Sequence, residues 1–229
     1  MKICLLSGTS IVNSSLFADW PVAELRTPYG VVTYRQKKNI HLINRHGPKG
    51  KKPPHAIPYR ANIKGVEDLG CSHILSLNSV GSLREDLPPG TLISCGDYIS
   101  FAPISFSDDE LRASVPKVGN GLLPDIEKLE KSEIPSGKIY IQTRGPRFET
   151  PAEVRVLRGW GDVVGMTMAS EADLANECPI DYTSLAMIDN FAHGIGEEPL
   201  TEELFRKRLQ ENQERVNELL DRIIGHYIA

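Results

Sequence analysis

Three short polar segments, each directly after an apolar run, carry groups that bind oxyanions. Ser7-Gly8-Thr9-Ser10 offers hydroxyls and backbone N–H groups, and Gly8 permits a tight turn around an anion. Arg45 and His46 follow a second run and add a fixed cation and an imidazole that titrates near neutral pH. Thr167 follows a third run and adds a neutral hydroxyl. Together they predict a phosphate site, with Arg45 holding phosphate oxygens through two parallel N–H bonds.

Each of these segments also has a simpler interpretation. Gly, Ser, Asn and Asp are common in turns, so any single strand end could be a turn without a ligand. Arg45 could form a surface ion pair, and the first segment lacks the GxxxxGK[ST] spacing of a P-loop. At least five strand ends carry such residues, and this number favours a composite site.

A second group of residues could recognise a heterocyclic base. Phe148 can stack on a purine, Glu149 can accept from a ring N–H, and the amide of Asn190 can both donate and accept. The alternatives are that Phe148 belongs to the core, that Glu149 is favoured by the dipole of the helix that follows, and that Asn190 belongs to a turn.

Apolar runs predict the elements that position these residues. The expected strands are residues 2–6, 39–43, 73–77, 91–94, 98–101, 138–142, 162–165 and 184–188. The expected helices are residues 57–69, 152–157 (after Pro151), 170–177 and a long amphipathic one at 201–227. Strands with small or polar residues at their carboxyl ends, each followed by a helix, are typical of α/β proteins, whose ligands bind at those ends.

The composition limits the partners. The chain has 229 residues, of which 40% are hydrophobic, enough for one substantial core. A net charge of −4 argues against nucleic acid and an anionic membrane, and the longest apolar runs are too short to span a bilayer. Its four cysteines form no CxxC pair and no metal-ligand spacing, and no signal peptide precedes the first strand. We therefore expect a cytoplasmic protein with reduced thiols and no metal.

Five motifs, in order along the chain, resemble the trimeric purine-nucleoside phosphorylase and methylthioadenosine phosphorylase family. A sixth, Tyr59-Arg60-Ala61-Asn62-Ile63, strengthens the likeness, which runs from Lys2 to about Ala192. The most specific motif is Gly145-Pro146-Arg147-Phe148-Glu149-Thr150. The other four are Gly8-Thr9, Arg45-His46-Gly47, Asn78-Ser79-Val80-Gly81-Ser82-Leu83 and Gly165-Met166-Thr167.

The resemblance implies a single domain over residues 1–229, with a central mixed, twisted sheet flanked by helices. It implies phosphorolysis of a purine nucleoside in purine salvage, by a homotrimer or a hexamer of two trimers. Inorganic phosphate would be a co-substrate, and no cofactor is expected. The implied phosphate ligands are Thr9, Arg45, His46, Ser79 (mainly its backbone) and Thr167. The implied nucleoside contacts are Met166 at the sugar and Phe148, Glu149, Asn190, Val80 and Gly81 at the base. Asn190, Glu149 and His46 would be catalytic.

The segment Asp189-Asn190-Phe191-Ala192 favours a 6-oxopurine. Relatives acting on 6-aminopurines carry aspartate where Asn190 and Ala192 stand. An ionised carboxylate repels O6, whereas an amide donates to N7 or O6 without a charge. Glu149 would accept the N1–H that 6-oxopurines have and adenine lacks.

Departures from the family pattern leave the 5′ group of the nucleoside open. Ser114 stands where methylthioadenosine phosphorylases carry a histidine that reaches a neighbouring subunit's 5′ pocket. Residues 128–137 look shortened, and no extra segment follows the last helix. Inosine, guanosine and methylthioinosine all remain candidate substrates. The alternatives are a methylthioadenosine phosphorylase, a nucleosidase that activates water, and a nucleoside-binding protein without catalysis.

Overall fold

The computed structural model describes residues 1–11, 14–110, 113–196 and 200–228. In this part of the chain nine strands form one sheet in the order β2-β3-β4-β1-β5-β8-β7-β6-β9. The strands are β1 (Ile3–Ser7), β2 (Val22–Thr27), β3 (Gly30–Lys37), β4 (Ile40–Asn44), β5 (His73–Ser82), β6 (Leu92–Ser100), β7 (Lys138–Gln142), β8 (Val163–Gly165) and β9 (Asp181–Phe191). The helices are α1 (Tyr59–Asp68), α2 (Leu123–Glu130), α3 (Pro151–Leu157), α4 (Met168–Asn176) and α5 (Glu202–Ile228).

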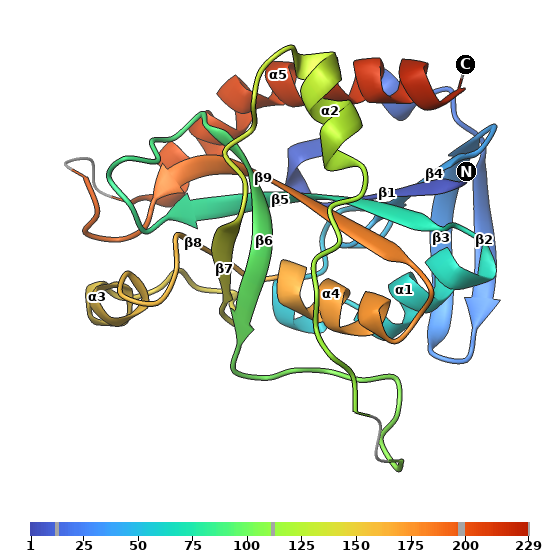
Figure 1. Ribbon diagram of the computed structural model, residues 1–229, viewed down its shortest axis with the longest axis horizontal. Coiled ribbons are helices and arrows are strands. Elements are labelled where there is room, and N and C mark those ends of the chain that lie inside the picture. The colour runs from blue at the N-terminus through green and yellow to red at the C-terminus, as the bar shows by residue number, and fades with distance from the viewer. Residues whose placement is uncertain (12–13, 111–112, 197–199, 229) are drawn as a thin grey trace.

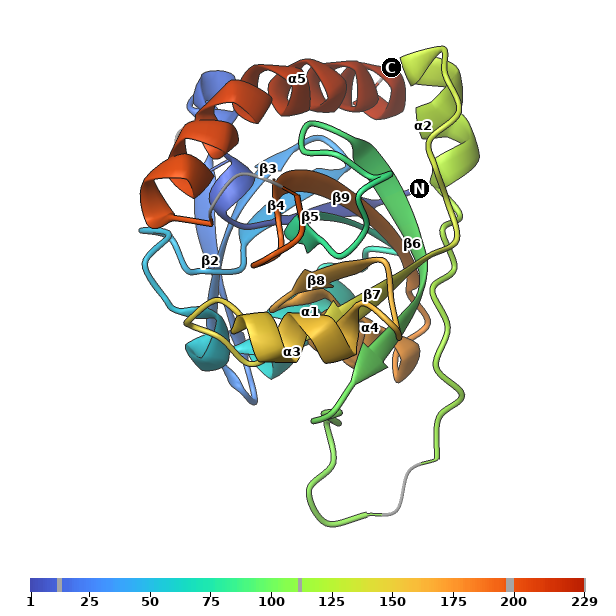
Figure 2. The ribbon, with the colours of Figure 1, turned by 90° about the vertical axis from the view of Figure 1, so that its left-hand side faces the viewer.

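The sheet is mixed and partly closed. β1 pairs in parallel with β4 and β5, whereas β2, β3 and β4 are joined by antiparallel pairings. β9 also pairs with β5, so β5, β8, β7, β6 and β9 form a closed ring from which the other four strands extend. Helices α5 and α2 lie on one side of the sheet and α1 and α4 on the other (Figures 1 and 2). This confirms the expected α/β fold with a mixed sheet between helices.

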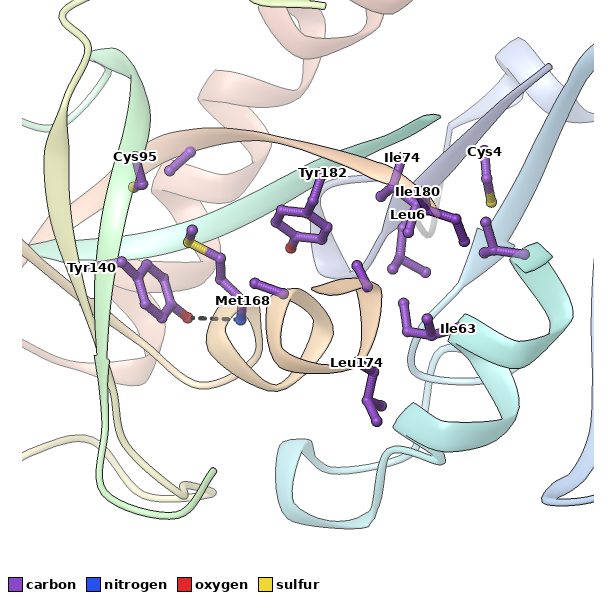
Figure 3. Packing of buried hydrophobic residues seen from close by; sticks show 14 of the residues in the cluster. Cys4, Leu6, Ile63, Ile74, Cys95, Tyr140, Met168, Leu174, Ile180 and Tyr182 are labelled. Atoms are coloured by element: carbon purple, nitrogen blue, oxygen red, sulfur yellow. Dashed lines mark hydrogen bonds between the residues drawn. The ribbon is translucent and has the colours of Figure 1, made fainter. Parts of the chain in front are cut away.

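Two apolar cores lie on the two faces of the sheet, and β1 contributes to both. Ile3 and Leu5 belong to the cluster that includes the buried face of α5, whereas Cys4 and Leu6 belong to the cluster with α1 and α4. Successive strand residues point to opposite faces, so a strand covered on both faces is apolar throughout, as β1 is. Figure 3 shows the second cluster, where Leu6 and Ile74 face Ile63 of α1.

Most of the expected elements are present. Helix α2 and the two strands of the β2–β3 hairpin were not predicted. Val32 is the one buried residue of these two strands, so the hairpin has no alternation of buried and exposed side chains. Residues 91–94 and 98–101, expected as two strands, form the single strand β6, because the chain passes Gly96 with a register irregularity instead of turning. A Cβ at Gly96 would lie 2.9 Å from the Cα of Gly137, so the close passage of these two segments needs glycine.

Candidate functional site

One cavity of about 280 Å³ gathers every residue proposed for the site from the sequence. Its wall is formed by residues that follow β1, β4 and β7 and by residues of β5, β8 and β9. The proposed residues in its wall are Thr9, Arg45, His46, Ser79, Val80, Gly81, Phe148, Glu149, Met166, Thr167 and Asn190.

Four of these residues lie within strands, not in the loops expected after them. Ser79, Val80 and Gly81 belong to β5, which continues to Ser82, and Asn190 belongs to β9. The strand continues because β9 and β8 hydrogen-bond to its last residues, with a bulge between Val80 and Gly81. Gly81 is paired with Asn190, and a Cβ on Gly81 would lie 3.1 Å from Asn190 Nδ2. Glycine therefore lets the amide lie close over β5.

The guanidinium of Arg45 is committed mainly to protein acceptors. Its Nε donates to Glu171 Oε1 (2.6 Å) and its Nη2 to Glu171 Oε2 (3.1 Å). Nη2 also donates to the Leu6 carbonyl and the Ser76 hydroxyl, and Nη1 donates to the Leu77 carbonyl. One N–H of Nη1 has no acceptor among the residues that the structure describes. The expected grip on phosphate through two parallel bonds is therefore wrong: that pair of bonds goes to Glu171.

The electrostatics of Arg45 follow from this pairing. Burial by itself would lower its pKa, but the Glu171 carboxylate, with smaller contributions from Tyr182 and Tyr59, more than offsets burial and raises the pKa, so the residue stays charged. Because Glu171 is also buried, its charge compensates that of Arg45 at close range. Arg45 therefore presents a directed N–H group to the cavity, while Glu171 balances its positive charge.

His46 is oriented by a backbone carbonyl. Its Nδ1 lies 2.6 Å from the carbonyl oxygen of Lys52, which can only accept, so Nδ1 carries the hydrogen. A Cβ on Gly8 would lie 2.9 Å from His46 Nε2 and 3.1 Å from Arg45 Nη1, so glycine allows both nitrogens to approach the turn. Burial lowers the pKa of His46; the Lys52 carbonyl opposes this shift and the Arg45 charge adds to it.

Thr167 is held in place by a buried tyrosine. The hydroxyl of Tyr140 accepts hydrogen bonds from the backbone N–H groups of Thr167 (3.0 Å) and Met168 (3.4 Å), the latter drawn in Figure 3. These N–H groups begin α4, where helix donors lack internal partners. A Cβ on Gly165 would overlap the Tyr140 hydroxyl, which explains the glycine of the Gly165-Met166-Thr167 motif.

Ser79 is linked to a buried carboxyl that the sequence did not single out. Its hydroxyl donates to Asp189 Oδ2, and Asn212 of α5 donates to Asp189 Oδ1 at 2.8 Å. Burial raises the pKa of Asp189 to about 6, although both hydrogen bonds oppose the shift. Asp189 directly precedes Asn190. Its carboxyl therefore links two residues of the cavity wall, Ser79 and Asn190, to Asn212 of α5.

At the other end of the cavity, Glu149 and Asn190 present polar groups. Glu149 is buried and accepts a 2.6 Å hydrogen bond from the hydroxyl of Thr143. Asn190 Nδ2 donates to the Phe191 carbonyl at 2.7 Å, which fixes the orientation of the amide. One N–H and the Oδ1 of Asn190 make no hydrogen bond within the described residues and are available to a ligand.

Apolar groups complete the wall. Phe148 packs edge to face against Phe205 of α5, with ring centroids 5.4 Å apart. The backbone carbonyl of Met166 accepts from the Tyr59 hydroxyl at 3.1 Å, which ties this segment to α1. The cavity thus has an aromatic wall as well as hydroxyl, amide and imidazole groups.

Sequence reasoning missed several residues of this site. Lys52 and Phe205 line the cavity, and Glu171 and Asp189 hold its walls. Lys52 is exposed at the surface and also reaches the cavity. No local pattern marks Glu171 or Phe205, because their partners lie far away in the chain.

A second, larger cavity of about 840 Å³ adjoins the first. Pro54, Glu149 and Met166 line both cavities. Phe101 and Val156 in its wall are 63% and 52% exposed, so the wall of this cavity carries large apolar side chains that face solvent. Ser114, the position of the expected departure, is exposed in an extended stretch and does not line the first cavity.

Among the residues that the structure describes, no group of three or more His, Cys, Asp or Glu side chains could hold a metal ion. No helix in the same part of the chain is long and apolar enough to cross a membrane.

The fold and the cavity define an α/β protein with a small-molecule site at the strand ends of a partly closed mixed sheet. Residues 9–225 match the family model described as "Phosphorylase superfamily", and the chain belongs to this superfamily.

Named relatives span almost the whole chain. It is 33% identical over 240 residues to the "Probable 6-oxopurine nucleoside phosphorylase" of Dictyoglomus turgidum, covering 98% of this chain and 91% of the relative. It is 34% identical over 212 residues to the "Probable S-methyl-5'-thioinosine phosphorylase" of Methanocaldococcus jannaschii, covering 88% and 84%. The structure of methylthioadenosine phosphorylase from Schistosoma mansoni with adenine has a TM-score of 0.81 at 22% identity, covering 99% of this chain and 92% of that one, which confirms the fold.

Proposed function

We propose that residues 1–229 form a single nucleoside phosphorylase domain, a pentosyltransferase that cleaves a 6-oxopurine nucleoside with inorganic phosphate. The products are the free base and ribose 1-phosphate, or its 5-methylthio analogue. The observation that carries the proposal is that anion-binding groups and base-recognition groups line the same cavity. The superfamily and the named relatives support the same reaction.

Binding of phosphate would depend on His46, Thr9, Thr167 and the N–H of Arg45 that has no acceptor among the described residues. These groups would position phosphate beneath C1′ of the sugar, which turns a bimolecular attack into an oriented one. No cofactor is needed, because the phosphate dianion itself stabilises the positive charge that develops on the sugar.

Recognition of the purine base would depend on Glu149 and Asn190. Glu149 would accept the N1–H of a 6-oxopurine, and the available N–H of Asn190 would stabilise charge that gathers on N7 or O6 as the base leaves. Ala192, also in the cavity wall, leaves no second carboxylate to accept from the amine of adenine. These contacts favour hypoxanthine or guanine over adenine, and hence disfavour methylthioadenosine.

We further propose that the enzyme is cytoplasmic and acts as a homotrimer, or as a hexamer of two trimers. The exposed side chains of Phe101, Val156 and Trp160 lie around the larger cavity or pack against its wall, and a second copy of the chain would cover them. Such a copy would lie next to Glu149 and Met166, and therefore next to the nucleoside.

A substrate panel tests the proposal. Inosine, guanosine, adenosine, methylthioinosine and methylthioadenosine are each incubated with the protein, with and without phosphate, and free base is measured. We expect phosphate-dependent release of hypoxanthine or guanine. Release without phosphate would indicate a nucleosidase, release of adenine alone would indicate a methylthioadenosine phosphorylase, and tight binding without release would indicate a binding protein.

A further inference from the structure

The two imidazole nitrogens of His46 differ: Nδ1 is hydrogen-bonded to the protein, and Nε2 is available to a ligand. The carbonyl of Lys52 occupies Nδ1 at 2.6 Å and requires the hydrogen to be there. In the neutral ring, Nε2 then carries a lone pair and no hydrogen. Nε2 makes no hydrogen bond to the residues at 1–11, 14–110, 113–196 and 200–228, and His46 lines the cavity while being only 9% exposed.

The neighbours of Nε2 belong to the anion end of the cavity. Nε2 and Arg45 Nη1 lie 2.9 and 3.1 Å from the same point beside the Cα of Gly8, where a side chain would begin. Thr9 follows directly and lines the same cavity. A tetrahedral anion bound here meets one guanidinium N–H, a hydroxyl and one bare ring nitrogen.

A bare nitrogen repels an oxyanion oxygen unless that oxygen carries a proton. Near pH 8 inorganic phosphate is mainly hydrogen phosphate, a dianion with one P–OH group, whereas sulfate is a dianion with none. Charge alone does not separate these two ions, and the charge of Arg45 is in any case compensated by Glu171. A site that distinguishes hydrogen phosphate from sulfate must therefore do so through the hydrogen-bond donors and acceptors of the cavity wall.

We infer that His46 acts as a hydrogen-bond acceptor for the P–OH group of hydrogen phosphate, so that the site selects the singly protonated dianion over oxyanions without a proton, such as sulfate. The inference rests on the proposed phosphorolysis and specifies the ionic form of its co-substrate. Thr9 and Thr167 do not supply this selectivity, because a hydroxyl can rotate to donate to either ion.

Competition binding tests the inference without turnover. Labelled phosphate is bound to the full chain at pH 8 and displaced with sulfate, in the wild type and in His46→Gln. We expect sulfate to bind about 10- to 100-fold more weakly than phosphate to the wild type, the range for one hydrogen bond to a charged group. In His46→Gln the ratio approaches one, because the amide can turn either its N–H or its oxygen to the anion.

A matched control separates the acceptor from general damage to the site. Thr9→Val removes a hydroxyl from the same anion end and weakens both ions, but leaves their ratio as in the wild type. Equal affinities of the wild type for the two ions, or an unchanged ratio in His46→Gln, would overturn the inference. Selective phosphate binding without base release from any nucleoside would overturn the proposed function and leave the inference standing; no phosphate binding at all would overturn both.

The pH dependence of sulfate binding gives a second readout. Sulfate remains a dianion between pH 5 and 8, so a change in its affinity reports protonation of the protein. The other charged side chains described in the cavity wall are Arg45, Lys52 and Glu149, which are common to the wild type and His46→Gln. Asp189, which accepts from Ser79, is also common to both proteins. We expect sulfate affinity to rise more steeply at acid pH in the wild type than in His46→Gln, because protonated His46 donates from Nε2, and burial lowers the pKa of His46 below its ordinary value. The same rise in His46→Gln would overturn the inference.

Discussion

Arg45 and Glu171 form an ion pair in which the two side chains are 3% and 1% exposed. The two residues are 126 positions apart, and Glu171 also accepts hydrogen bonds from Ser76 (2.9 Å) and Tyr182 (2.9 Å). The carboxylate therefore joins α4 to β5, β9 and the segment that follows β4. The pair fixes the direction of the N–H group of Arg45 that has no acceptor within the described part of the chain.

Replacing Glu171 by Gln should destabilise the fold strongly. The substitution leaves the buried charge of Arg45 uncompensated, and breaking such a pair typically costs about 3–5 kcal/mol. The free energy of unfolding in urea measures the loss. Glu202→Gln is the matched control, because the exposed pair of Glu202 with Arg206 should be worth less than about 1 kcal/mol. Similar losses in the two variants would contradict a special role for the buried pair.

Thr143 should tune the affinity for the base through Glu149. The Thr143 hydroxyl donates to Glu149 Oε1 at 2.6 Å, so Thr143→Val frees the carboxylate to rotate. We expect kcat/KM for the nucleoside to fall about tenfold, the range for one hydrogen bond to a charged group, with little change in KM for phosphate. Thr143→Ser keeps the hydroxyl and should retain activity. An equal rise of KM for both substrates in Thr143→Val would point to general disorder of the site.

Carboxylates at positions 190 and 192 should shift the preference between bases. In Asn190→Asp combined with Ala192→Asp, two acceptors face the position of the exocyclic group, which favours the amine of adenine and repels O6. We expect the ratio of kcat/KM for adenosine to that for inosine to rise at least about tenfold, which corresponds to 1.4 kcal/mol. Glu149 is unchanged in this variant, so an unaltered ratio would show that residues 190 and 192 do not select the base.

The sequence was most informative where local chemistry decides the structure. Residues 138–142 are β7, as expected, since a short apolar run forms a buried strand. Helix α3 begins at Pro151 behind Thr150, whose hydroxyl accepts from the Glu153 N–H in a capping box. The eleven proposed site residues line one cavity because the segments that follow β1, β4, β7 and β8 meet residues of β5 and β9 there.

Other features depend on contacts between distant residues. The polar, glycine-containing stretch after Leu77 resembles a turn, yet β8 and β9 keep it extended as part of β5. The sequence did not predict that Glu171 accepts the two parallel N–H bonds of Arg45, because nothing near Arg45 in the sequence indicates its partner. Asp189 was likewise overlooked, since its hydrogen-bond partners, Ser79 and Asn212 of α5, lie far from it in the chain.

Asp189 also gives the protein a stability that depends on pH. In the folded state burial raises the pKa of Asp189 to about 6 from a usual value of 3.8. The folded protein therefore holds this proton more tightly than the unfolded chain does. The resulting stability is fully present below pH 3.8 and is lost as the pH rises through about 6.

We expect this carboxyl to make the wild type more stable at pH 5 than at pH 8 by about 1 kcal/mol, since one pKa unit corresponds to 1.36 kcal/mol. Urea unfolding at both pH values measures the total change, to which other groups also contribute. In Asp189→Asn those other groups titrate as before, so the difference in pH dependence between the two proteins isolates Asp189. If both proteins lose the same stability from pH 5 to pH 8, Asp189 is ionised in the folded state throughout this range. Its hydrogen bonds from Ser79 and Asn212 then outweigh the cost of burying the charge.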